Sequence, residues 1–588
     1  MKGMLAGFIR EIYHKDPPEV NEFHGDWGSL AVSRNIYRGF EPLETESHLF
    51  VVICGPVLNF RDNRFLTGDD PVAGTTAIFE RYWREEIRWD DDLSGPFAVL
   101  IVDKADCKIQ WITDLMLFIP VYEYVGEKTL AIGTHVDALA KTADLQHDID
   151  KVSLVDFVLN KVVTYPHTTY SRIRQCHPAA VQTCRPNMNP IPKPERVVYW
   201  TPKETANYKN MDATAEALRN AVSSYIGRVT ESMDHIALFL SGGEDSRTVA
   251  AMLPDCLKKD GFIFLDSMNR EGHLARKAAV IHGVNLTVKL RKTTHYLDIL
   301  PEASDLIGSG RQSLHAHTLG FHKECGFDKY DAIFGGYLGE TLLRAFDARK
   351  KLNLNLKKFP FLPEKILKGE THSEPLSSSL FSGKVLGDID RRRKMFLDMV
   401  REYRSDSVHE WFQLWPRTMG YSNPNIDVNR RLFRSYEPYT SSEVVKLAAS
   451  VPATWKINRK LFHKAFRKYH KPSKWIPHSS GYYPYFPWWF NTPFQFLYWF
   501  LKKTRRRLTK KGNFEGPWND WVSLKKTDTW NAMVADCMSE DFLQSLPAVQ
   551  DPANRDEIGK EELRNNRMVN LFQARYFLRK REFYSHEA

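Results

Sequence analysis

Hydrophobic positions in the first 200 residues or so come in short runs bounded by turn residues. Examples are residues 49–54, 97–102 and 121–125. Runs of this length are typical of β-strands, and the residues after Met4 continue the strand-like pattern. Residues 79–87, in contrast, have apolar positions at helical spacing. We therefore predict a β-rich N-terminal region that contains a helix at 79–87.

From residue 211 onward, strand-like and helix-like patterns alternate. The predicted elements are helices at 211–229 and 271–282 and strands at 236–240, 261–265 and 284–290. Alternation of this kind favours an open, doubly wound parallel sheet of the α/β class. The Pro- and Lys-rich residues 190–202 lie between the two regions and are predicted to be a linker.

The most informative stretch joins the strand at 236–240 to the helix that follows. After Leu240 it reads Ser241-Gly242-Gly243-Glu244-Asp245-Ser246. A Gly-rich turn from strand to helix points several backbone N–H groups at one spot, near the positive end of the helix dipole, which suits a phosphate. The two Ser hydroxyls add donors. Asp245 would repel a phosphate, so we expect it to bind a Mg²⁺ ion that bridges to the phosphates.

Composition narrows the class of protein. The chain has 588 residues, of which 43% are hydrophobic and 26% charged, as in an ordinary soluble protein of two to four domains. Seven scattered Cys without metal-type spacing suit a reducing cytosol. We expect no signal peptide. The net charge of +10 is spread over many segments, and without a nucleic-acid-binding motif we predict no nucleic-acid partner.

The turn at 241–246 resembles the Ser-Gly-Gly-x-Asp-Ser pyrophosphate loop of the ATP pyrophosphatases, and within that group the asparagine-synthetase family. Residues 93–100, 113–122 and 131–139 resemble stretches of that family's glutaminase domain. Residues 437–456 and 460–466 resemble stretches of its synthetase domain. The resemblance implies an Ntn-hydrolase-like β-sandwich with a linker at 1–200 and an ATP-pyrophosphatase domain at 201–485. A helical extension at 486–588 lies beyond both.

The resemblance also implies that the glutaminase chemistry is lost. The family's nucleophile is an N-terminal Cys, and Lys2 stands at that position. Its Asn-Gly oxyanion pair matches Cys54-Gly55, and the Asp that binds the amino group of glutamine matches Ser94. A nucleophile, an oxyanion donor and a substrate anchor are therefore all replaced. We expect the N-terminal domain to be structural.

A second strand, Gly-rich turn and helix occupy residues 330–344 and resemble the family's Gly-x-Gly-x-Asp-Glu-Leu stretch. Aligning Gly336 with its first Gly makes Glu340 the second Mg²⁺ ligand. The same alignment places Tyr337 where the related β-lactam synthetases carry a catalytic Tyr. Its expected carboxylate partner is Glu370 or Glu374, although a loop Glu is often only solvated. A different alignment would instead make Asp331 the metal ligand.

Other site residues follow from position in the sheet and from the resemblance. Asp266 and Ser267 follow the strand at 261–265, so we expect them near the adenosine, with ordinary turn residues as the alternative. The family's lysine that neutralises the adenylate matches Ser479 or Ser480. Lys474 is our candidate replacement, and Lys471 and His478 are further alternatives.

Residues 486–511 combine many aromatic side chains with a run of Lys and Arg. This segment is too short and interrupted for a transmembrane helix. It suits either peripheral membrane contact through an interfacial helix or a helix packed on the core with a solvated basic end.

The resemblance implies an ATP- and Mg²⁺-dependent amide ligase that adenylates a carboxylate, releases pyrophosphate and couples the acyl group to an amine. Without a glutaminase, the amine is expected to come from the substrate, as in the relatives that close the macrolactam ring of lasso peptides. A precursor peptide, together with partner biosynthetic proteins, is then the expected partner. The alternatives are an ammonia-dependent asparagine synthetase, a β-lactam-synthetase-like cyclase and a non-catalytic scaffold.

Overall fold

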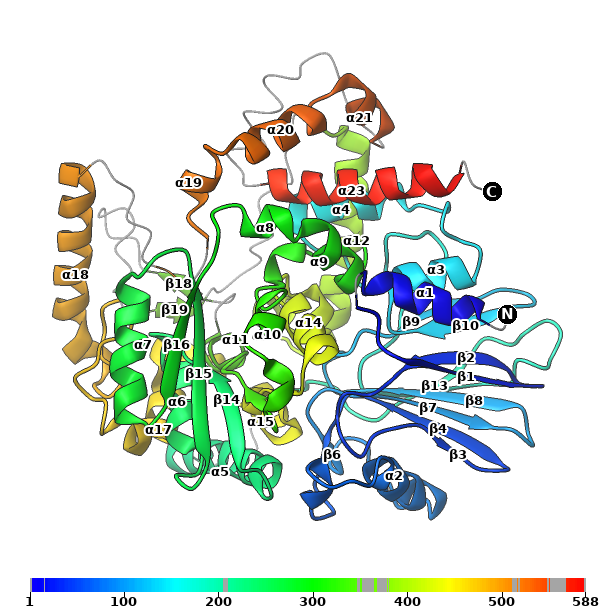
Figure 1. The fold of residues 1–588 in the computed structure, drawn as a ribbon, viewed down its shortest axis with the longest axis horizontal. Coiled ribbons are helices and arrows are strands. Elements are labelled where there is room, and N and C mark those ends of the chain that lie inside the picture. The colour runs from blue at the N-terminus through cyan, green and yellow to red at the C-terminus, as the bar shows by residue number, and fades with distance from the viewer. Residues whose placement is uncertain are drawn as a thin grey trace.

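The computed structural model describes residues 3–585 except 15, 205–209, 346–348, 352–363, 367–377, 379, 510–515, 517–518, 547–548 and 550–566. It is a mixed α/β fold with antiparallel sheets toward the N-terminus, a parallel sheet in the second part and many helices (Figure 1). None of the helices in the described part of the chain is long and apolar enough to cross a membrane.

Antiparallel strands form the N-terminal part. The largest sheet has the order β13-β12-β8-β7-β4-β3, a second has the order β10-β9-β11, and β1 pairs with β2 and β5 with β6. The strands are β1 (Val20–Gly25), β2 (Gly28–Ser33), β3 (Leu43–Glu44), β4 (His48–Ile53), β5 (Val57–Leu58), β6 (Leu93–Ser94), β7 (Ala98–Asp103), β8 (Lys108–Thr113), β9 (Tyr122–Val125), β10 (Leu130–Gly133), β11 (Arg174–Gln175), β12 (Ala180–Cys184) and β13 (Glu195–Val198). The helices of this part are α1 (Met4–Ile12), α2 (Ala73–Trp83), α3 (Val136–Thr142) and α4 (Lys151–Asn160).

Three local predictions for this part were wrong. The chain begins with the helix α1 rather than a strand, because Leu5 and Ile12 bury one helical face and the Glu22 carboxylate accepts the N–H groups of the first turn. Helix α2 begins before residue 79 and ends before Glu85, which has a φ of 58°. The expected linker contains the edge strand β13, whose exposed side chains tolerate the flanking prolines.

The second part is organised around a five-stranded parallel sheet of order β16-β15-β14-β17-β20. Its strands are β14 (His235–Phe239), β15 (Lys258–Leu265), β16 (Asn285–Leu290), β17 (Ile333–Phe334) and β20 (Ser435–Tyr436). The predicted helix at 211–229 is confirmed as α5 (Met211–Thr230), and that at 271–282 as α7 (Arg270–Ile281). The strand order places a switch point between β14 and β17. From β14 the chain continues to β15 and β16 on one side, and from β17 it continues to β20 on the other side.

The remaining elements are mostly helices that surround the parallel sheet and form the C-terminal extension. They are α6 (Glu244–Met252), α8 (His295–Asp298), α9 (Leu300–Ile307), α10 (Phe321–Glu324), α11 (Gly339–Leu343), α12 (Gly383–Arg401), α13 (Val408–Trp411), α14 (Pro424–Leu432), α15 (Ser442–Ser450), α16 (Ala453–Lys456), α17 (Lys460–His470), α18 (Trp488–Thr509), α19 (Trp521–Leu524), α20 (Asp528–Cys537), α21 (Glu540–Ser545) and α23 (Met568–Ser585). Strand β18 (Arg349–Lys351) pairs antiparallel with β19 (Glu364–Ile366), and 3₁₀ helices lie at Arg64–Leu66, Ser313–His315, Phe327–Lys329, Arg417–Met419, Pro438–Thr440 and Ile457–Arg459.

One hydrophobic core continues from the N-terminal sheets into the second part. Trp415 is fully buried between them, and its indole N–H donates to the carbonyl of Leu115 at 2.9 Å. The Tyr37 hydroxyl donates to the carbonyl of Ser435 at 3.0 Å, directly beside β20. A separate cluster unites α23 with α4, α12 and α20, so the C-terminal helix lies beside the N-terminal part (Figure 1).

Candidate active site

The turn predicted to bind phosphate lies at the carboxyl edge of the parallel sheet, between β14 and α6. This is the switch point of the sheet, because the neighbours of β14 are β15 on one side and β17 on the other. Ligands of open α/β sheets bind at such a point. Leu240 is buried, and its N–H donates to the carbonyl of Phe262 at 3.1 Å, which ties the turn to β15.

The backbone N–H groups of this turn have acceptors within the protein. The N–H of Ser241 donates to Ser246 Oγ at 3.1 Å, and that of Gly243 to Ser241 Oγ at 3.1 Å. The N–H of Gly242 donates to the carboxylate of Glu271 at 2.8 Å, on α7. Burial raises the pKa of Glu271. A carboxylate on this N–H occupies a donor that a phosphate oxygen would use, so an incoming phosphate has to compete with Glu271.

Two acidic residues of the turn share one buried arginine. Arg459 Nε lies 2.7 Å from the Glu244 carboxylate. The same guanidinium donates hydrogen bonds to the Asp245 carboxylate and, at 2.9 Å, to the carbonyl of Gly339. Glu244 also accepts hydrogen bonds from Tyr482 and His463. Burial raises the pKa of Asp245 to about 6; Arg459 opposes the rise, and the negative charges of Glu244 and Glu340 add to it. The sequence pattern indicated Asp245 but not Arg459.

The second Gly-rich turn, after β17, packs directly on the first. A Cβ atom on Gly336 would lie 2.6 Å from the backbone nitrogen of Ser246, and one on Gly339 would lie 2.6 Å from the carboxyl carbon of Asp245. At Gly336 the neighbouring atoms are backbone, so only glycine fits there, whereas a Cβ at Gly339 would displace the Asp245 carboxylate. The glycines thus bring the start of α11, with Glu340, to Asp245.

The predicted metal ligands Asp245 and Glu340 therefore face one region, although Glu340 also forms an ion pair with Arg344. The alternative ligand, Asp331, lies at the other edge of the sheet. Its carboxylate accepts the N–H groups of Asp234 and His235, at the start of β14, each at 3.1 Å. The geometry thus favours the alignment that uses Glu340.

Asp245 and Glu340 suit Mg²⁺ as hard oxygen ligands. Within the residues that the structure describes, no group of three or more His, Cys, Asp or Glu side chains forms a complete metal site. Two carboxylates fit an ion that takes its remaining ligands from phosphate oxygens and water, which is how Mg²⁺ is commonly bound in nucleotide sites.

The residues expected near the adenosine lie at the carboxyl end of β15. Asp266 accepts a hydrogen bond from Arg291 Nε at 2.9 Å and another from the backbone N–H of Asp520, in the C-terminal extension. Ser267 follows it and is exposed. The side chain of Asn269 donates to the carbonyl of Gly516 at 3.0 Å. The C-terminal extension therefore contacts this edge of the sheet, which the sequence did not predict.

Tyr337 forms two hydrogen bonds through its hydroxyl group. Its hydroxyl donates to Ser422 Oγ at 2.8 Å and accepts a hydrogen bond from Arg417, which is buried, at 3.1 Å. Glu370 and Glu374, the expected carboxylate partners, lie outside the described residues. Among the described residues, Tyr337 thus contacts a guanidinium and a hydroxyl through its phenol oxygen.

Glu437 is a buried acid that sequence reasoning did not single out. It follows β20, and its carboxylate accepts the N–H of Tyr337 at 2.9 Å. A Cβ on Gly335 would lie 2.2 Å from this carboxylate. Burial raises the pKa of Glu437 to about 8. The sequence offered one signal for Glu437: it lies directly before Pro438, in the stretch at 437–456 that resembles the synthetase domain of the asparagine-synthetase family.

The candidate replacements for the family's lysine lie at different distances from the turn at 241–246. Lys474 lies with its ammonium 5.7 Å from the ring centre of Trp475, an exposed side chain. His478 lies closer to the phosphate turn, since a Cβ on Gly243 would be 3.8 Å from its Nε2, and burial lowers its pKa to about 4. Arg459 and Arg344 are the guanidinium groups that contact the predicted metal ligands.

The residues 476–482 are fixed against the phosphate turn by Arg247. This buried side chain donates to the carbonyls of Ile476 at 2.8 Å, Pro477 at 3.2 Å and Gly242 at 3.1 Å. Residues 476–482, which match the family's lysine region in sequence, thus lie beside the turn at 241–246, although they contain no lysine.

The positions that would carry glutaminase chemistry are occupied by structural contacts. Cys54 is buried with a φ of 72°, and burial raises the pKa of its thiol. Ser94 Oγ donates to Glu443 of α15 at 3.0 Å and accepts the N–H of Ser442 at 3.0 Å. Asn59 donates to the same Glu443 carboxylate at 2.7 Å. These residues connect the two parts of the molecule.

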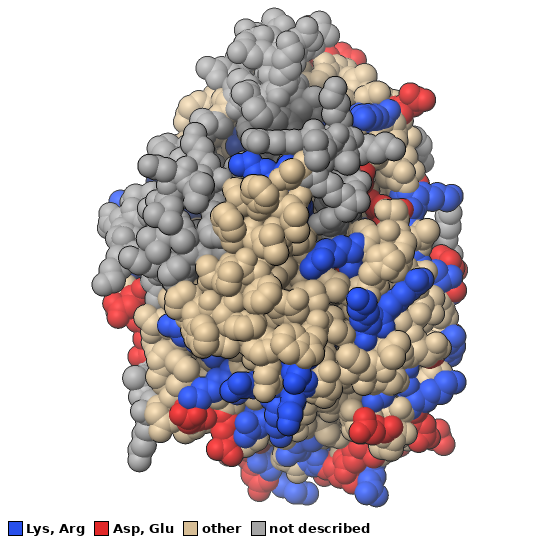
Figure 2. Space-filling view, turned by 90° about the vertical axis from the view of Figure 1, so that its left-hand side faces the viewer, with Lys and Arg blue, Asp and Glu red and all other residues tan. Residues whose placement is uncertain are grey.

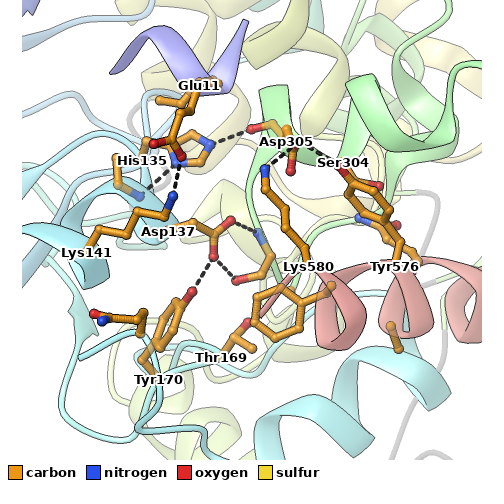
Figure 3. A pocket seen from close by; sticks show the side chains of 18 of the residues that line it. Glu11, His135, Asp137, Lys141, Thr169, Tyr170, Ser304, Asp305, Tyr576 and Lys580 are labelled. Atoms are coloured by element: carbon orange, nitrogen blue, oxygen red, sulfur yellow. Dashed lines mark hydrogen bonds and ion pairs between the residues drawn. The ribbon is translucent and has the colours of Figure 1, made fainter. Parts of the chain in front are cut away.

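Two cavities lie away from the phosphate turn. One, of about 270 Å³, has Cys54 among its lining residues and is bounded mainly by aliphatic and aromatic side chains of the N-terminal sheets. The other, of about 290 Å³, lies where α1, α3, α9 and α23 meet (Figure 3). In it, Asp137 accepts hydrogen bonds from Tyr170 and Ser309, and Asp305 pairs with Lys580 at 2.7 Å. No predicted site residue lines the second cavity.

Comparison with known proteins supports the assignment of the N-terminal part. Residues 30–194 match the family model of the glutamine amidotransferase domain. This match fits an asparagine-synthetase-like protein and suggests an enzyme. No curated protein matches the chain.

Proposed function

We propose that this protein is an ATP-dependent ligase that adenylates a substrate carboxylate and couples it to an amine. The observation that carries the proposal is the juxtaposition of two Gly-rich turns at the switch point of the parallel sheet. One turn presents backbone N–H groups and Asp245, and the other presents Glu340. Phosphate donors beside hard oxygen ligands are the combination that a nucleotide with Mg²⁺ requires.

The first half-reaction would use the turn at 241–246. A substrate carboxylate attacks the α-phosphorus of ATP, the bond to the β-phosphate breaks, and an acyl-adenylate and pyrophosphate form. Binding of the phosphates needs the N–H of Gly242 to exchange its Glu271 acceptor for a phosphate oxygen. Asp245 and Glu340 would hold a Mg²⁺ ion, which supplies charge stabilisation to the departing pyrophosphate. Arg459 keeps the Asp245 carboxylate oriented.

The second half-reaction needs a base for the attacking amine. Tyr337 belongs to the second turn, and its hydroxyl contacts Ser422, shortly before α14, and the Arg417 guanidinium. The Arg417 guanidinium and the Ser422 hydroxyl hold the Tyr337 hydroxyl in position. We assign Tyr337 the role of accepting the amine proton as the amide bond forms and AMP leaves.

The source of the amine distinguishes the candidate reactions. Ser94 and Asn59 are engaged by Glu443, and Cys54 is enclosed by the core. These contacts argue against glutamine hydrolysis at the amidotransferase-type domain, so the amine comes from the substrate or from ammonia. We favour an amine within a peptide substrate, which gives a macrolactam of the lasso-peptide type. The alternatives are an ammonia-dependent asparagine synthetase and a cyclase of the β-lactam-synthetase type.

A single assay separates these reactions. Purified protein with ATP and Mg²⁺ is incubated with peptides that carry a free N-terminus and an internal Asp or Glu, with aspartate and ammonia, or with glutamine. We expect pyrophosphate release and a product lighter by one water with a peptide. Asparagine formation would instead assign an asparagine synthetase, and steady glutamate release from glutamine would refute the structural role of the N-terminal domain. Failure to bind ATP would leave only a non-catalytic scaffold.

A further inference from the structure

Helix α18 exposes an unusual set of large apolar side chains. The exposed fractions are 63% for Trp489, 43% for Phe496, 53% for Leu497, 52% for Phe500 and 56% for Leu501. Residues 489, 493, 496 and 500 recur at intervals of three and four, so they share one face of the helix, and Leu497 lies next to this face. Water therefore contacts a continuous aromatic and aliphatic face more than three turns long, which is rare for a helix of a soluble domain.

The opposite face of α18 is fixed to the protein. Asn491 is buried and forms hydrogen bonds with the backbone of Tyr483 and Phe486 at 2.8–2.9 Å. The ring of Tyr498 lies 4.6 Å from the guanidinium carbon of Arg270, on α7. It also packs so closely on Gly481 that a Cβ there would lie 2.6 Å away. The apolar face is therefore presented in a fixed orientation.

The charge of this segment has one sign. Residues 486–511 contain no Asp or Glu, and their basic residues are Lys502, Lys503, Arg505, Arg506, Arg507, Lys510 and Lys511. The ammonium of Lys503 lies 4.7 Å from the ring centre of Trp499. Figure 2, which views the side that carries α18, shows an uncharged ridge with Lys and Arg around it and no Asp or Glu at its centre. An anionic surface complements this charge distribution.

We propose that α18 binds the surface of an anionic phospholipid bilayer, with its axis in the plane of the interface. Aromatic side chains such as Trp489 and Phe500 would enter the region between headgroups and acyl chains, where amphipathic rings are favoured. Lys502 and Lys503 would contact the lipid phosphates. Pro493 and the basic end exclude a spanning orientation, in agreement with the absence of a membrane-crossing helix from the described residues.

The attachment of α18 places such a membrane close to the candidate active site. The helix follows residues 476–482, which Arg247 fixes to the phosphate turn, and Tyr482 donates to Glu244 at 2.8 Å. Gly481, which contacts Tyr498, lies in the same stretch. A bilayer that binds the exposed face of α18 would thus lie on the side of the molecule where this stretch approaches the turn. The proposal itself does not depend on the reaction catalysed.

The test is vesicle co-sedimentation of the full-length protein. Vesicles contain phosphatidylcholine alone or with one third phosphatidylserine. We expect binding to the anionic vesicles that falls at least about tenfold in high salt, because screening weakens contact with the headgroups. The combined variant Trp489→Ser, Leu497→Ser, Phe500→Ser should lose at least about tenfold in affinity through its lost apolar burial, and Lys502→Glu with Lys503→Glu should lose a similar amount.

Matched controls come from exposed side chains elsewhere. Trp83→Ser, Met395→Ser and Val522→Ser remove equally exposed apolar groups from other helices, and Lys384→Glu with Lys394→Glu reverses two exposed charges on α12. These variants should bind as the wild type does. Equal binding to neutral vesicles, or full binding by the α18 variants, would overturn the proposal. A lack of binding to either vesicle would also overturn it. A dimer in gel filtration that is abolished in the α18 variant would assign the exposed face to contact with a second copy of the chain.

Discussion

Two turns of this molecule, each after a buried strand, differ in what surrounds them. The turn after β14 lies among carboxylates and guanidinium groups, with Asp245 and Glu340 facing one region and Arg459 beside them. The turn after β4, at Cys54, is enclosed by Tyr37 and the hydrophobic core. A turn after a buried strand is therefore not sufficient for a functional site. Such a site also needs polar groups that converge on a space open to a ligand.

Side-chain hydrogen bonds join the N-terminal part to the second part of the molecule. The contacts of Glu443 with Ser94 and Asn59 join α15, which follows the parallel sheet, to the N-terminal part. Trp415 and Tyr37 extend the same contact into the core. The N-terminal part thus contacts β20 and α15, two elements of the second part of the molecule.

The largest expected effect is at the first turn. Asp245→Ala should reduce ATP–pyrophosphate exchange by at least about a thousandfold, because a metal ligand next to the reacting phosphates contributes several kcal/mol. Asp331→Ala is the matched control from the other edge of the sheet and should retain exchange. Loss of exchange in Asp331→Ala together with activity in Glu340→Ala would reverse the choice between the two alignments.

Tyr337→Phe is expected to separate the two half-reactions. Adenylation should persist, while amide formation slows by roughly 10²–10⁴-fold, the usual size of a general-base contribution. Pyrophosphate exchange and product formation are measured on the same variant. An equal loss in both would mean that Tyr337 only packs near the nucleotide and would exclude the base role.

Glu437 should make stability depend on pH in an unusual direction. Its pKa is raised from 4.5 to about 8, so the folded protein keeps a proton that the unfolded chain has lost between these values. Stability therefore falls as pH rises from about 4.5 to about 8. Urea unfolding at pH 6 and pH 8 should show a smaller decline for Glu437→Gln than for the wild type. The difference between the two proteins removes contributions from other titrating groups, such as Asp114, and an identical decline would contradict the assignment.

The smallest effect is expected at the contact between the two parts. Glu443→Ala should lower the free energy of unfolding by about 0.5–1.5 kcal/mol, since its hydrogen bonds to Ser94 and Asn59 are partly exposed. Glutamate release from glutamine should stay absent in this variant. Glutaminase activity in this variant would show that the contact between the two parts covers a competent glutaminase site.

Local pattern was enough to predict the elements around the phosphate turn. The strand, the turn at 241–246 and the helices α5 and α7 depend on hydrophobic periodicity and on glycine, which act over a few residues. The same reasoning failed at α1, because one apolar segment can suit a helix or a strand and only its packing decides. It also failed at β13, because an edge strand needs a neighbour that the local sequence does not contain.

What the sequence by itself determined is therefore the Gly-rich turn at 241–246 and the class of sheet that presents it. Tertiary structure decided its surroundings: Arg459 reaches Asp245 across 214 positions of the chain, and Glu437 reaches the N–H of Tyr337 across 100. It also decided which face of α18 contacts water, for which the sequence allowed both a packed and an interfacial helix. The physical reason is that burial, ion pairing and exposure depend on distant parts of the chain, whereas turns and periodicity do not.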